Sequence, residues 1–299
     1  MLSRNAASGR YDSGTRGSLA QLLTNDLMAV HKDGHLKVFA TDPGEQDLPP
    51  SPPKSLPPAI QSARWIAPGI AYIRPSAFLQ SEDELHAFHT FMEEHRDART
   101  IIFDLRNNHG GGNAESDIVF SYLFAKKTPL TRLEMSRATF DERGRPLPST
   151  PTLEVTEGAE VVAGTRYALP GENTPLRSAQ VLLLVSNRTQ SAAEGFAVAL
   201  QSTGRGTLIG ESTAGADHFG GPMPINEDMG VWMPIGRSSD VRTGKDWEGA
   251  GVAPDVAVDP KQALVVALEK AGLSHAEAVK LDAQEVPAEP VHADKLSAR

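Results

Sequence analysis

Apolar residues along this chain recur at two spacings, one typical of helices and one typical of strands. Residues 18–32 carry leucines and a valine every three or four positions, with Ser18 as the cap, which predicts a helix. An Asp-Gly turn follows, and residues 35–40 predict a short strand. Residues 42–58 contain seven prolines, a density that no helix or central strand tolerates, so we expect an extended linker there.

Beyond this linker, strand-like and helix-like patterns alternate, which favours an α/β core built on a largely parallel sheet. Residues 128–178 follow neither period and are rich in Pro, Thr and Arg, which predicts loops with short strands. A tail rich in Pro, Ala and charge begins at residue 284, and we expect it to be disordered. The expected strands are 69–74, 99–105, 180–186, 207–210 and 230–234, and the expected helices are 81–95, 114–124, 191–201 and 260–271.

Composition and charge exclude several classes of protein. With 39% hydrophobic and 22% charged residues, the 299-residue chain has the composition of a soluble globular protein. Its net charge of −9 argues against a nucleic-acid partner, since no strong positive field exists to neutralise phosphates. The absence of cysteine excludes disulfides, thiolate metal sites and a cysteine nucleophile. The longest apolar run, Val181–Val185, is far shorter than the roughly 20 residues of a spanning helix, so we expect no integral membrane segment.

A glycine cluster, Gly110–Gly112, directly follows one of the predicted buried strands. Its backbone N–H groups and the positive end of the next helix can stabilise an anion, either a phosphate or the oxyanion of acyl transfer. No Gly-Lys-Ser/Thr follows, so this is not a P-loop. On the local pattern alone, a tight turn with glycines at positive φ is the simpler interpretation. We expect Arg106 to brace this turn through a charge-assisted hydrogen bond to Asp104.

Ser191 begins a predicted helix after the most apolar strand of the chain. A serine there has its hydroxyl near the positive end of the helix dipole and near free N–H groups, which suits a nucleophile. The sequence Ser-Ala-Ala-Glu, ending at Glu194, is also a regular capping box. The local pattern alone favours the cap over the nucleophile.

Four segments in a fixed order carry a resemblance to a known family. The chain resembles the tail-specific (C-terminal processing) serine proteases, and is most similar to the branch without a PDZ domain that includes modules like interphotoreceptor retinoid-binding protein. The similarity spans roughly residues 65–265 and implies an α/β fold with a crotonase/ClpP-like β-α spiral core and a small N-terminal helical segment. The segments are Asp-Leu-Arg-x-Asn-x-Gly-Gly at 104–111, Ser-Ala-Ala-Glu at 191–194, Gly-Glu-x-Thr-x-Gly at 210–215 and Trp-Glu-Gly-x-Gly-Val-x-Pro-Asp at 247–255.

The resemblance also suggests a division of the chain. Residues 33–36, Asp-Gly-His-Leu, are similar to the N-terminal region of that branch, so we expect a partial helical domain whose leading part is missing. Residues 1–17 lack the apolar core of a signal peptide. We therefore expect a cytoplasmic protein, or a periplasmic or secreted one whose leader has been removed. The expected parts are the helical domain at 1–41, a linker at 42–64 with no room for a PDZ domain, a protease-like core at 65–283 and a disordered tail at 284–299.

Carried over by position, Ser191 falls on the family's nucleophile. The resemblance implies an oxyanion hole made by the N–H of Ala192 and the backbone of Gly110 or Gly111. It also implies supporting roles for the pair formed by Asp104 and Arg106 and for Glu194, and it requires no metal and no organic cofactor.

The general base is the point at which the chain departs from the family. Ala216 occupies the position of the lysine base, and Arg74 occupies the strand position where tricorn-like relatives have a histidine. Glu248 does fall on the late glutamate of those relatives. Our first candidate for the base is His218, oriented by Glu248 or Asp217, because a histidine near its ordinary pKa is a competent base.

Other histidines are weaker candidates. His109 is second to His218 as the base, and His218 itself can equally be an exposed loop histidine. His86 and His89 are three residues apart on one predicted helix, but no partner at ligand spacing supports a metal site.

These patterns predict a serine endopeptidase that binds an unstructured or C-terminal polypeptide segment in extended form beside a core strand. An alternative is an inactive binding module for an apolar small molecule or peptide, and the missing lysine and strand histidine favour it. An acyl-CoA enzyme of the crotonase type is a third interpretation, weakened by the absence of a nucleotide-binding signal.

Overall fold

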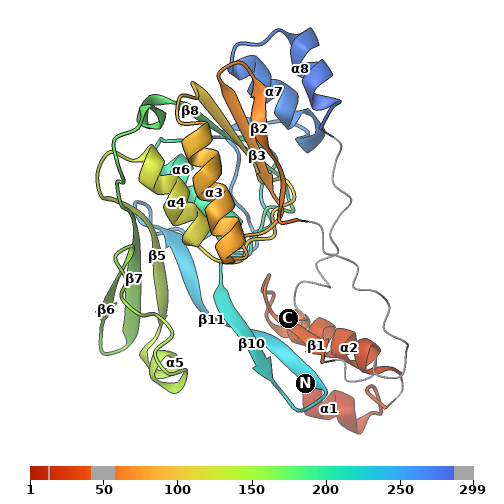
Figure 1. Cartoon of the computed structure of the whole chain (residues 1–299). Coiled ribbons are helices and arrows are strands. Elements are labelled where there is room, and N and C mark those ends of the chain that lie inside the picture. Colours follow the sequence, from red (N-terminus) through yellow and green to blue (C-terminus); the bar gives the residue numbers. More distant parts are fainter. Residues whose placement is uncertain (13, 42–57, 286–299) are drawn as a thin grey trace.

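The computed structural model describes residues 1–12, 14–41 and 58–285 (Figure 1). Most of the predicted linker and nearly all of the predicted tail lie outside these residues. Two six-stranded sheets form the framework, one largely parallel and one antiparallel. No helix in the described ranges combines the length and apolar character that crossing a bilayer requires.

The first sheet carries the core, in the order β12-β9-β8-β4-β3-β2. Five of its strands run parallel, and only β2 pairs antiparallel to its neighbour. This confirms the α/β class with a largely parallel sheet. The strands are β2 (Ile60–Ala67), β3 (Ile70–Pro75), β4 (Thr100–Asp104), β8 (Gln180–Val185), β9 (Thr207–Gly210) and β12 (Val256–Ala257).

Alternate residues of the central strands point to opposite faces of this sheet, and each face is covered by helices. Ile101 and Phe103 of β4 pack with the helices α3, α4 and α6, whereas Ile102 packs with α7 on the other face. Because both faces are buried, the strands are continuous apolar runs, which is why the sequence predicts them well. The helices are α3 (Glu82–Glu94), α4 (Ala114–Leu123), α6 (Ala192–Ser202), α7 (Ala263–Lys270) and α8 (His275–Asp282), with short 3-10 turns η2 (Pro175–Ser178) and η3 (Pro260–Gln262).

The second sheet is antiparallel and has the order β1-β11-β5-β7-β6, with β10 paired to β11. The sequence analysis expects loops with short strands at residues 128–178, and the structure has three strands, one helix and the turn η2 there. The strands are therefore confirmed, but two of them are long, with nine and eight residues. Such half-buried strands alternate polar and apolar residues and contain Pro and Gly, so their apolar signal is weak. Strand β11 also extends beyond the predicted 230–234. The elements are β1 (Lys37–Ala40), β5 (Thr128–Ser136), α5 (Arg137–Glu142), β6 (Leu153–Glu157), β7 (Val161–Ala168), β10 (Phe219–Pro224) and β11 (Met229–Asp240).

The N-terminal segment, residues 1–12 and 14–41, forms α1 (Leu2–Ala7), α2 (Arg16–Val30) and β1. Strand β1 pairs antiparallel with β11, and α2 packs on the same strands through a small apolar cluster. In Figure 1 the β10–β11 ribbon reaches from the core to this segment. Strand β2 begins at Ile60, inside the range 42–64 that the sequence analysis assigns to the linker. The chain therefore returns to the core soon after the proline-rich stretch.

Phe196 of α6 joins the sheet to the helices of its face. Its ring lies 5.3 Å from Phe103, 5.2 Å from Phe120 and 6.1 Å from Phe78, measured between centroids. We predict that Phe196→Ala lowers the free energy of unfolding by about 3–5 kcal/mol, as expected for emptying an aromatic site in a packed core. The matched control is Val279→Ala at an exposed position, which should change it by less than about 0.5 kcal/mol. Urea unfolding of both variants measures the difference, and a loss below about 1 kcal/mol for Phe196→Ala contradicts this packing.

Candidate active site

Ser191 stands at the junction between β8 and α6 in an unusual backbone conformation. Its φ of 56° and ψ of −124° lie in a region that residues other than glycine rarely adopt. Its own N–H donates to Glu194 Oε2 at 2.9 Å, and the Glu194 N–H donates to the Ser191 carbonyl oxygen at 2.8 Å. Ser191 and Glu194 thus form the capping box that the sequence analysis describes. The start of the helix is held by these two residues together.

Glu194 is completely buried and holds Ser191 against the loop that follows β9. Besides the Ser191 N–H, its carboxylate accepts hydrogen bonds from the Thr213 hydroxyl at 2.6 Å, the Gly215 N–H at 2.8 Å and the Ala216 N–H at 2.9 Å. Burial raises the pKa of Glu194, and these four donors oppose that shift by favouring the carboxylate. This side chain therefore ties the stretch 213–216 directly to the start of α6.

The glycine turn lies directly against the nucleophile candidate. A Cβ added at Gly110, whose φ is 82°, would lie 2.8 Å from both the Ala192 nitrogen and the Ser191 Cβ. The turn is held by Asn108, which accepts from the Gly110 N–H at 2.8 Å and donates to the Pro75 carbonyl at 3.1 Å. Only glycine permits this approach of the turn to Ser191.

Two N–H groups beside Ser191 have no acceptor among the described residues, those of Gly111 and Ala192. Phe78 forms a parallel bridge with Gly111: the Phe78 N–H donates to the Gly110 carbonyl, and the Phe78 carbonyl accepts from the Gly112 N–H. In such a bridge the N–H of the central residue, Gly111, faces away from Phe78. Ala192 is the first residue of α6 and has no carbonyl four residues earlier within the helix. The N–H of Gly110, in contrast, is already bonded to Asn108.

Asp104 and Arg106 form a two-bond ion pair under the glycine turn. Arg106 Nε lies 2.9 Å from Asp104 Oδ1, and its terminal nitrogen lies 2.6 Å from Oδ2. Tyr72 donates to the same carboxylate at 2.7 Å, and Arg106 also donates to the Pro260 carbonyl at 2.7 Å. Burial raises the pKa of Asp104, but the Arg106 charge outweighs it and holds the pKa below its ordinary value. This pair connects the end of β4 to the start of η3.

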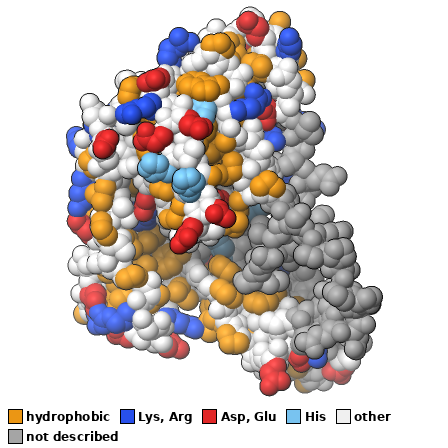
Figure 2. Space-filling model, viewed as in Figure 1, with side chains coloured by type: hydrophobic (Ala, Val, Ile, Leu, Met, Phe, Trp, Pro, Cys, Tyr) orange, Lys and Arg blue, Asp and Glu red, His pale blue; other side chains and the backbone are white. Residues whose placement is uncertain are grey.

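A cleft of about 550 Å³ opens beside Ser191, between the glycine turn, α4 and the second sheet. In Figure 2 hydrophobic side chains gather in the recess between the core and the second sheet. The lining combines residues that acyl transfer would need with apolar side chains and further polar ones. The first group is Gly111, Ser191, Ala192, Asp217 and His218, and the apolar side chains include Leu133, Leu147, Leu153, Phe219 and Trp247.

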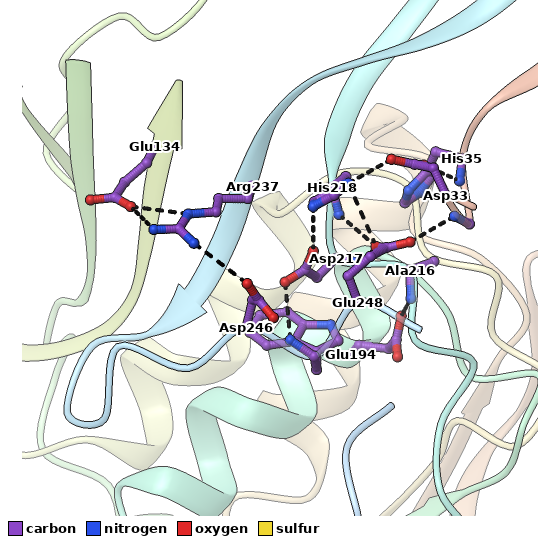
Figure 3. A network of polar contacts seen from close by, with 12 residues as sticks. Asp33, His35, Glu134, Glu194, Ala216, Asp217, His218, Arg237, Asp246 and Glu248 are labelled. Atoms are coloured by element: carbon purple, nitrogen blue, oxygen red, sulfur yellow. Dashed lines mark hydrogen bonds and ion pairs between the residues drawn. The ribbon is translucent and has the colours of Figure 1, made fainter. Parts of the chain in front are cut away.

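His218 lies among three carboxylates at this cleft (Figure 3). Its Nδ1 is 2.5 Å from Asp33 Oδ2 and 4.0 Å from Glu248 Oε2, and its Nε2 is 3.6 Å from Asp217 Oδ1. Burial lowers the pKa of His218, but the Asp33 hydrogen bond and the neighbouring carboxylates outweigh it, so the net shift is upward. No hydrogen bond joins His218 to Ser191 within the described structure.

Glu248 connects the N-terminal segment to this histidine. Its Oε1 accepts from the Gly34 N–H at 2.7 Å, and its Oε2 accepts from the Asp217 N–H at 2.8 Å and the His218 N–H at 3.3 Å. Glu248 therefore fixes the backbone of His218, whereas Asp33 contacts the ring. The orienting carboxylate closest to the imidazole is one that the sequence analysis did not name.

Asp33, His218 and Glu248 each offer a ligand atom within 4.8 Å of the others, a spacing that would also suit a metal centre. Both oxygens of Glu248 and both of Asp33 already accept hydrogen bonds from N–H groups or face the imidazole. The chemistry of the group is that of a hydrogen-bonded histidine–carboxylate assembly.

His109, the second candidate for the base, is absent from the lining of the cleft, and burial lowers its pKa.

The model of peptidase family S41 matches residues 69–258, which is more than half of the chain. The chain belongs to peptidase family S41. The matched range includes the glycine turn, Ser191, His218 and Glu248, but it excludes Asp33.

Two curated relatives of this S41 chain are named as processing enzymes. A carboxyl-terminal-processing protease of Synechocystis sp. is 26% identical over 192 residues, which are 64% of this chain and 38% of the relative. A chloroplastic C-terminal processing peptidase of Tetradesmus obliquus is 32% identical over 99 residues, which are 33% of this chain and 21% of the relative. The chain thus spans less than half the length of these curated relatives.

Solved structures share the fold at low sequence identity. A candidate peptidase from Parabacteroides merdae has a TM-score of 0.60 at 16% identity, and the match covers 87% of this chain and 84% of that one. A lipoprotein from Streptococcus agalactiae has a TM-score of 0.53 at 14% identity, with 86% and 82% covered. These likenesses extend over most of the S41 chain.

Ala216, which the sequence analysis sets at the position of the lysine base, is 1% exposed. Gly34 of the N-terminal segment packs against it so closely that a Cβ on Gly34 would lie 2.8 Å from the Ala216 Cβ. The space beside Ala216 is therefore filled by the N-terminal segment. Asp33 and Asn108 are the site residues that sequence reasoning missed, although each stands inside a motif that the sequence analysis quotes.

We predict that Gly110→Ala lowers the free energy of unfolding by at least about 2 kcal/mol more than Gly204→Ala does, because overpacking adds to backbone strain. Both glycines have positive φ, but a Cβ at Gly204 would meet nothing within 4 Å. Gly204→Ala should therefore cost only the left-handed strain, about 1 kcal/mol. Denaturant unfolding of the two variants tests the close approach of turn and nucleophile, and equal losses would contradict it.

Proposed function

We propose that this S41 chain is a serine endopeptidase with Ser191 as the nucleophile. The observation that supports it most directly is that Ser191, Gly111, Ala192 and His218 line one cleft. A hydroxyl, two N–H groups without acceptors and an imidazole are the parts that acyl transfer requires.

In the proposed reaction, the Ser191 oxygen attacks the peptide carbonyl and its proton passes to Nε2 of His218. The carbonyl oxygen becomes an oxyanion and accepts hydrogen bonds from the N–H groups of Gly111 and Ala192. We choose Gly111 over Gly110 because the Gly110 N–H is already committed to Asn108.

Collapse of this intermediate breaks the C–N bond, and His218 returns its proton to the leaving amine. Water then attacks the Ser191 ester while His218 accepts its proton. The ester C–O bond breaks, His218 returns that proton to the Ser191 oxygen, and the new carboxylic acid is released. The absence of a hydrogen bond between Ser191 and His218 is compatible with this role, since such bonds often shorten only when substrate is bound.

The proposed substrate is an unstructured or C-terminal polypeptide segment bound in extended form. The names of the two curated relatives support this class. The wall of the cleft includes Thr131 and Leu133 of β5, whose backbone is already paired with β7 and β11, so this strand would meet an extended segment through its side chains. Apolar residues such as Leu147 and Trp247 would contact its side chains.

We also infer that the core follows the crotonase/ClpP-like β-α spiral. Its support is the strand order β3-β4-β8-β9-β12, in which each strand in the chain is added beside the previous one of the parallel sheet. Helices α3 and α6 separate successive strands, as a right-handed spiral requires.

We predict that Ser191→Ala lowers the hydrolysis of an unfolded protein substrate by 10³-fold or more, in keeping with roughly that loss for a removed nucleophile. Ser212→Ala, at an exposed serine beyond the same sheet edge, is the matched control and should keep wild-type activity. Fluorescence release from labelled unfolded casein measures both. Folded wild-type protein without activity would contradict the proposal and favour the binding-module alternative.

We predict that kcat/KM falls as the pH drops through the pKa of His218, because a protonated imidazole cannot accept the serine proton. Since that pKa is raised, the midpoint of the acid limb should lie above the ordinary histidine value of 6.5. The charged and titratable groups facing the ring are Asp33, His35, Asp217 and Glu248. A rate profile whose acid limb has its midpoint near the carboxylate range, about pH 4, would contradict this assignment of the base.

A further inference from the structure

Asp33 lies in the loop between α2 and β1, far from the family match in sequence, and its side chain is almost fully buried. Its Oδ1 accepts the N–H groups of His35 at 2.8 Å and Leu36 at 3.2 Å. These bonds form an Asx-type turn that fixes the carboxylate relative to its own backbone. The second oxygen, Oδ2, is left to point at His218 (Figure 3).

The contact between Asp33 Oδ2 and His218 Nδ1 is 2.5 Å, the shortest that either side chain makes. A carboxylate can only accept, so Nδ1 must carry the proton of this bond. A neutral imidazole protonated on Nδ1 has its lone pair on Nε2. The tautomer set by Asp33 is thus the one in which Nε2 can take a proton from a hydroxyl.

We propose that Asp33 is a positioning residue of the active site, which orients His218 and fixes its tautomer, and that the site is complete only when the N-terminal segment is docked. This inference rests on the proposed function of Ser191 and His218. It joins an N-terminal carboxylate to a histidine that is 185 residues away in the chain.

Docking of the segment is held by contacts that converge on the same loop. Gly34 donates to Glu248, which in turn binds the backbone of His218. Gly34 also packs on Ala216, so a long side chain at residue 216 and the present position of the loop exclude each other. The pairing of β1 with β11, from Lys37 with Trp232 to Ala40 with Met229, anchors the segment just beyond the loop.

The other carboxylates near the ring do not substitute for Asp33. Glu248 approaches Nδ1 only to 4.0 Å and uses both oxygens on backbone N–H groups. Asp217 faces the opposite nitrogen, Nε2, at 3.6 Å, and burial raises its pKa to about 7. The imidazole of His35 is stacked beside Trp232, and burial lowers the pKa of His35.

The test compares Asp33→Asn with wild type in the peptidase assay. Asparagine can present its amide nitrogen to Nδ1 and so favour the wrong tautomer, so we expect kcat to fall by about 10²-fold or more with little change in KM. The acid limb of the pH profile should move to lower pH, since the ring loses a carboxylate partner. Asp33→Glu, which keeps the charge, should recover part of kcat and of the pH limb.

The matched control is Asp26→Asn in α2. Asp26 is another buried aspartate of the N-terminal segment, held by Arg10 and Tyr11, and it makes no contact with His218. Removing the Asp26 carboxylate should lower the free energy of unfolding without moving the acid limb of the peptidase pH profile. If Asp26→Asn and Asp33→Asn change kcat and the pH limb alike, the role of Asp33 is only structural and the proposal is overturned.

A second measurement does not require the Asp33 variants to fold. In Ser191→Ala protein labelled with nitrogen-15 histidine, the ring shifts of His218 above its pKa report which nitrogen carries the proton. The proposal predicts protonation on Nδ1, and protonation on Nε2 would overturn it.

Different results would overturn the role of Ser191 and the role of Asp33. Peptidase activity that survives in Ser191→Ala overturns the proposed function, whatever the histidine tautomer is. Activity that is lost in Ser191→Ala but unchanged in Asp33→Asn leaves the proposed function standing and overturns the role of Asp33.

Discussion

The candidate site depends above all on one buried carboxylate, that of Glu194. It satisfies four donors at once, from Ser191, Thr213, Gly215 and Ala216, and so binds the start of α6 to the loop after β9. A buried acceptor with this many donors is costly to disturb, because each unpaired donor would lose its partner away from water. The unusual backbone of Ser191 persists because this network over-determines it. His218 lies two residues beyond this network and is held by Glu248 and Asp33.

Around this centre the site is assembled from three distant parts of the chain. The parallel sheet supplies the glycine turn and Ser191 at the ends of β4 and β8, where consecutive parallel strands meet at one edge. The loop after β9 supplies His218. The N-terminal segment supplies Asp33, and Gly34 fills the space beside Ala216. The same short loop of the N-terminal segment therefore packs on Ala216 and brings a carboxylate to His218.

Sequence reasoning succeeded where the physical signal was local and strong. The strands β4 and β8 are buried on both faces, so their apolar runs were easy to identify, and the order of short motifs led to the family. For residues 128–178 it predicted loops with short strands, and it missed the helix α5 and the length of β5 and β7, because a half-polar strand pattern resembles that of a loop. It could not choose between Gly110 and Gly111, because the choice depends on a hydrogen bond to Asn108 that only the folded turn displays. Asp33 was missed as a partner of His218 because nothing in linear spacing relates residues that meet only through the pairing of β1 with β11.

The most direct test of the central claim is covalent labelling of the folded chain with a fluorophosphonate, followed by peptide mass mapping. Such a reagent reacts with a serine whose oxygen is activated and whose oxyanion hole is formed. The account predicts a single adduct on Ser191, formed about 10²-fold more slowly in His218→Gln. An adduct on another residue, no adduct at all, or an unchanged labelling rate in His218→Gln would contradict it.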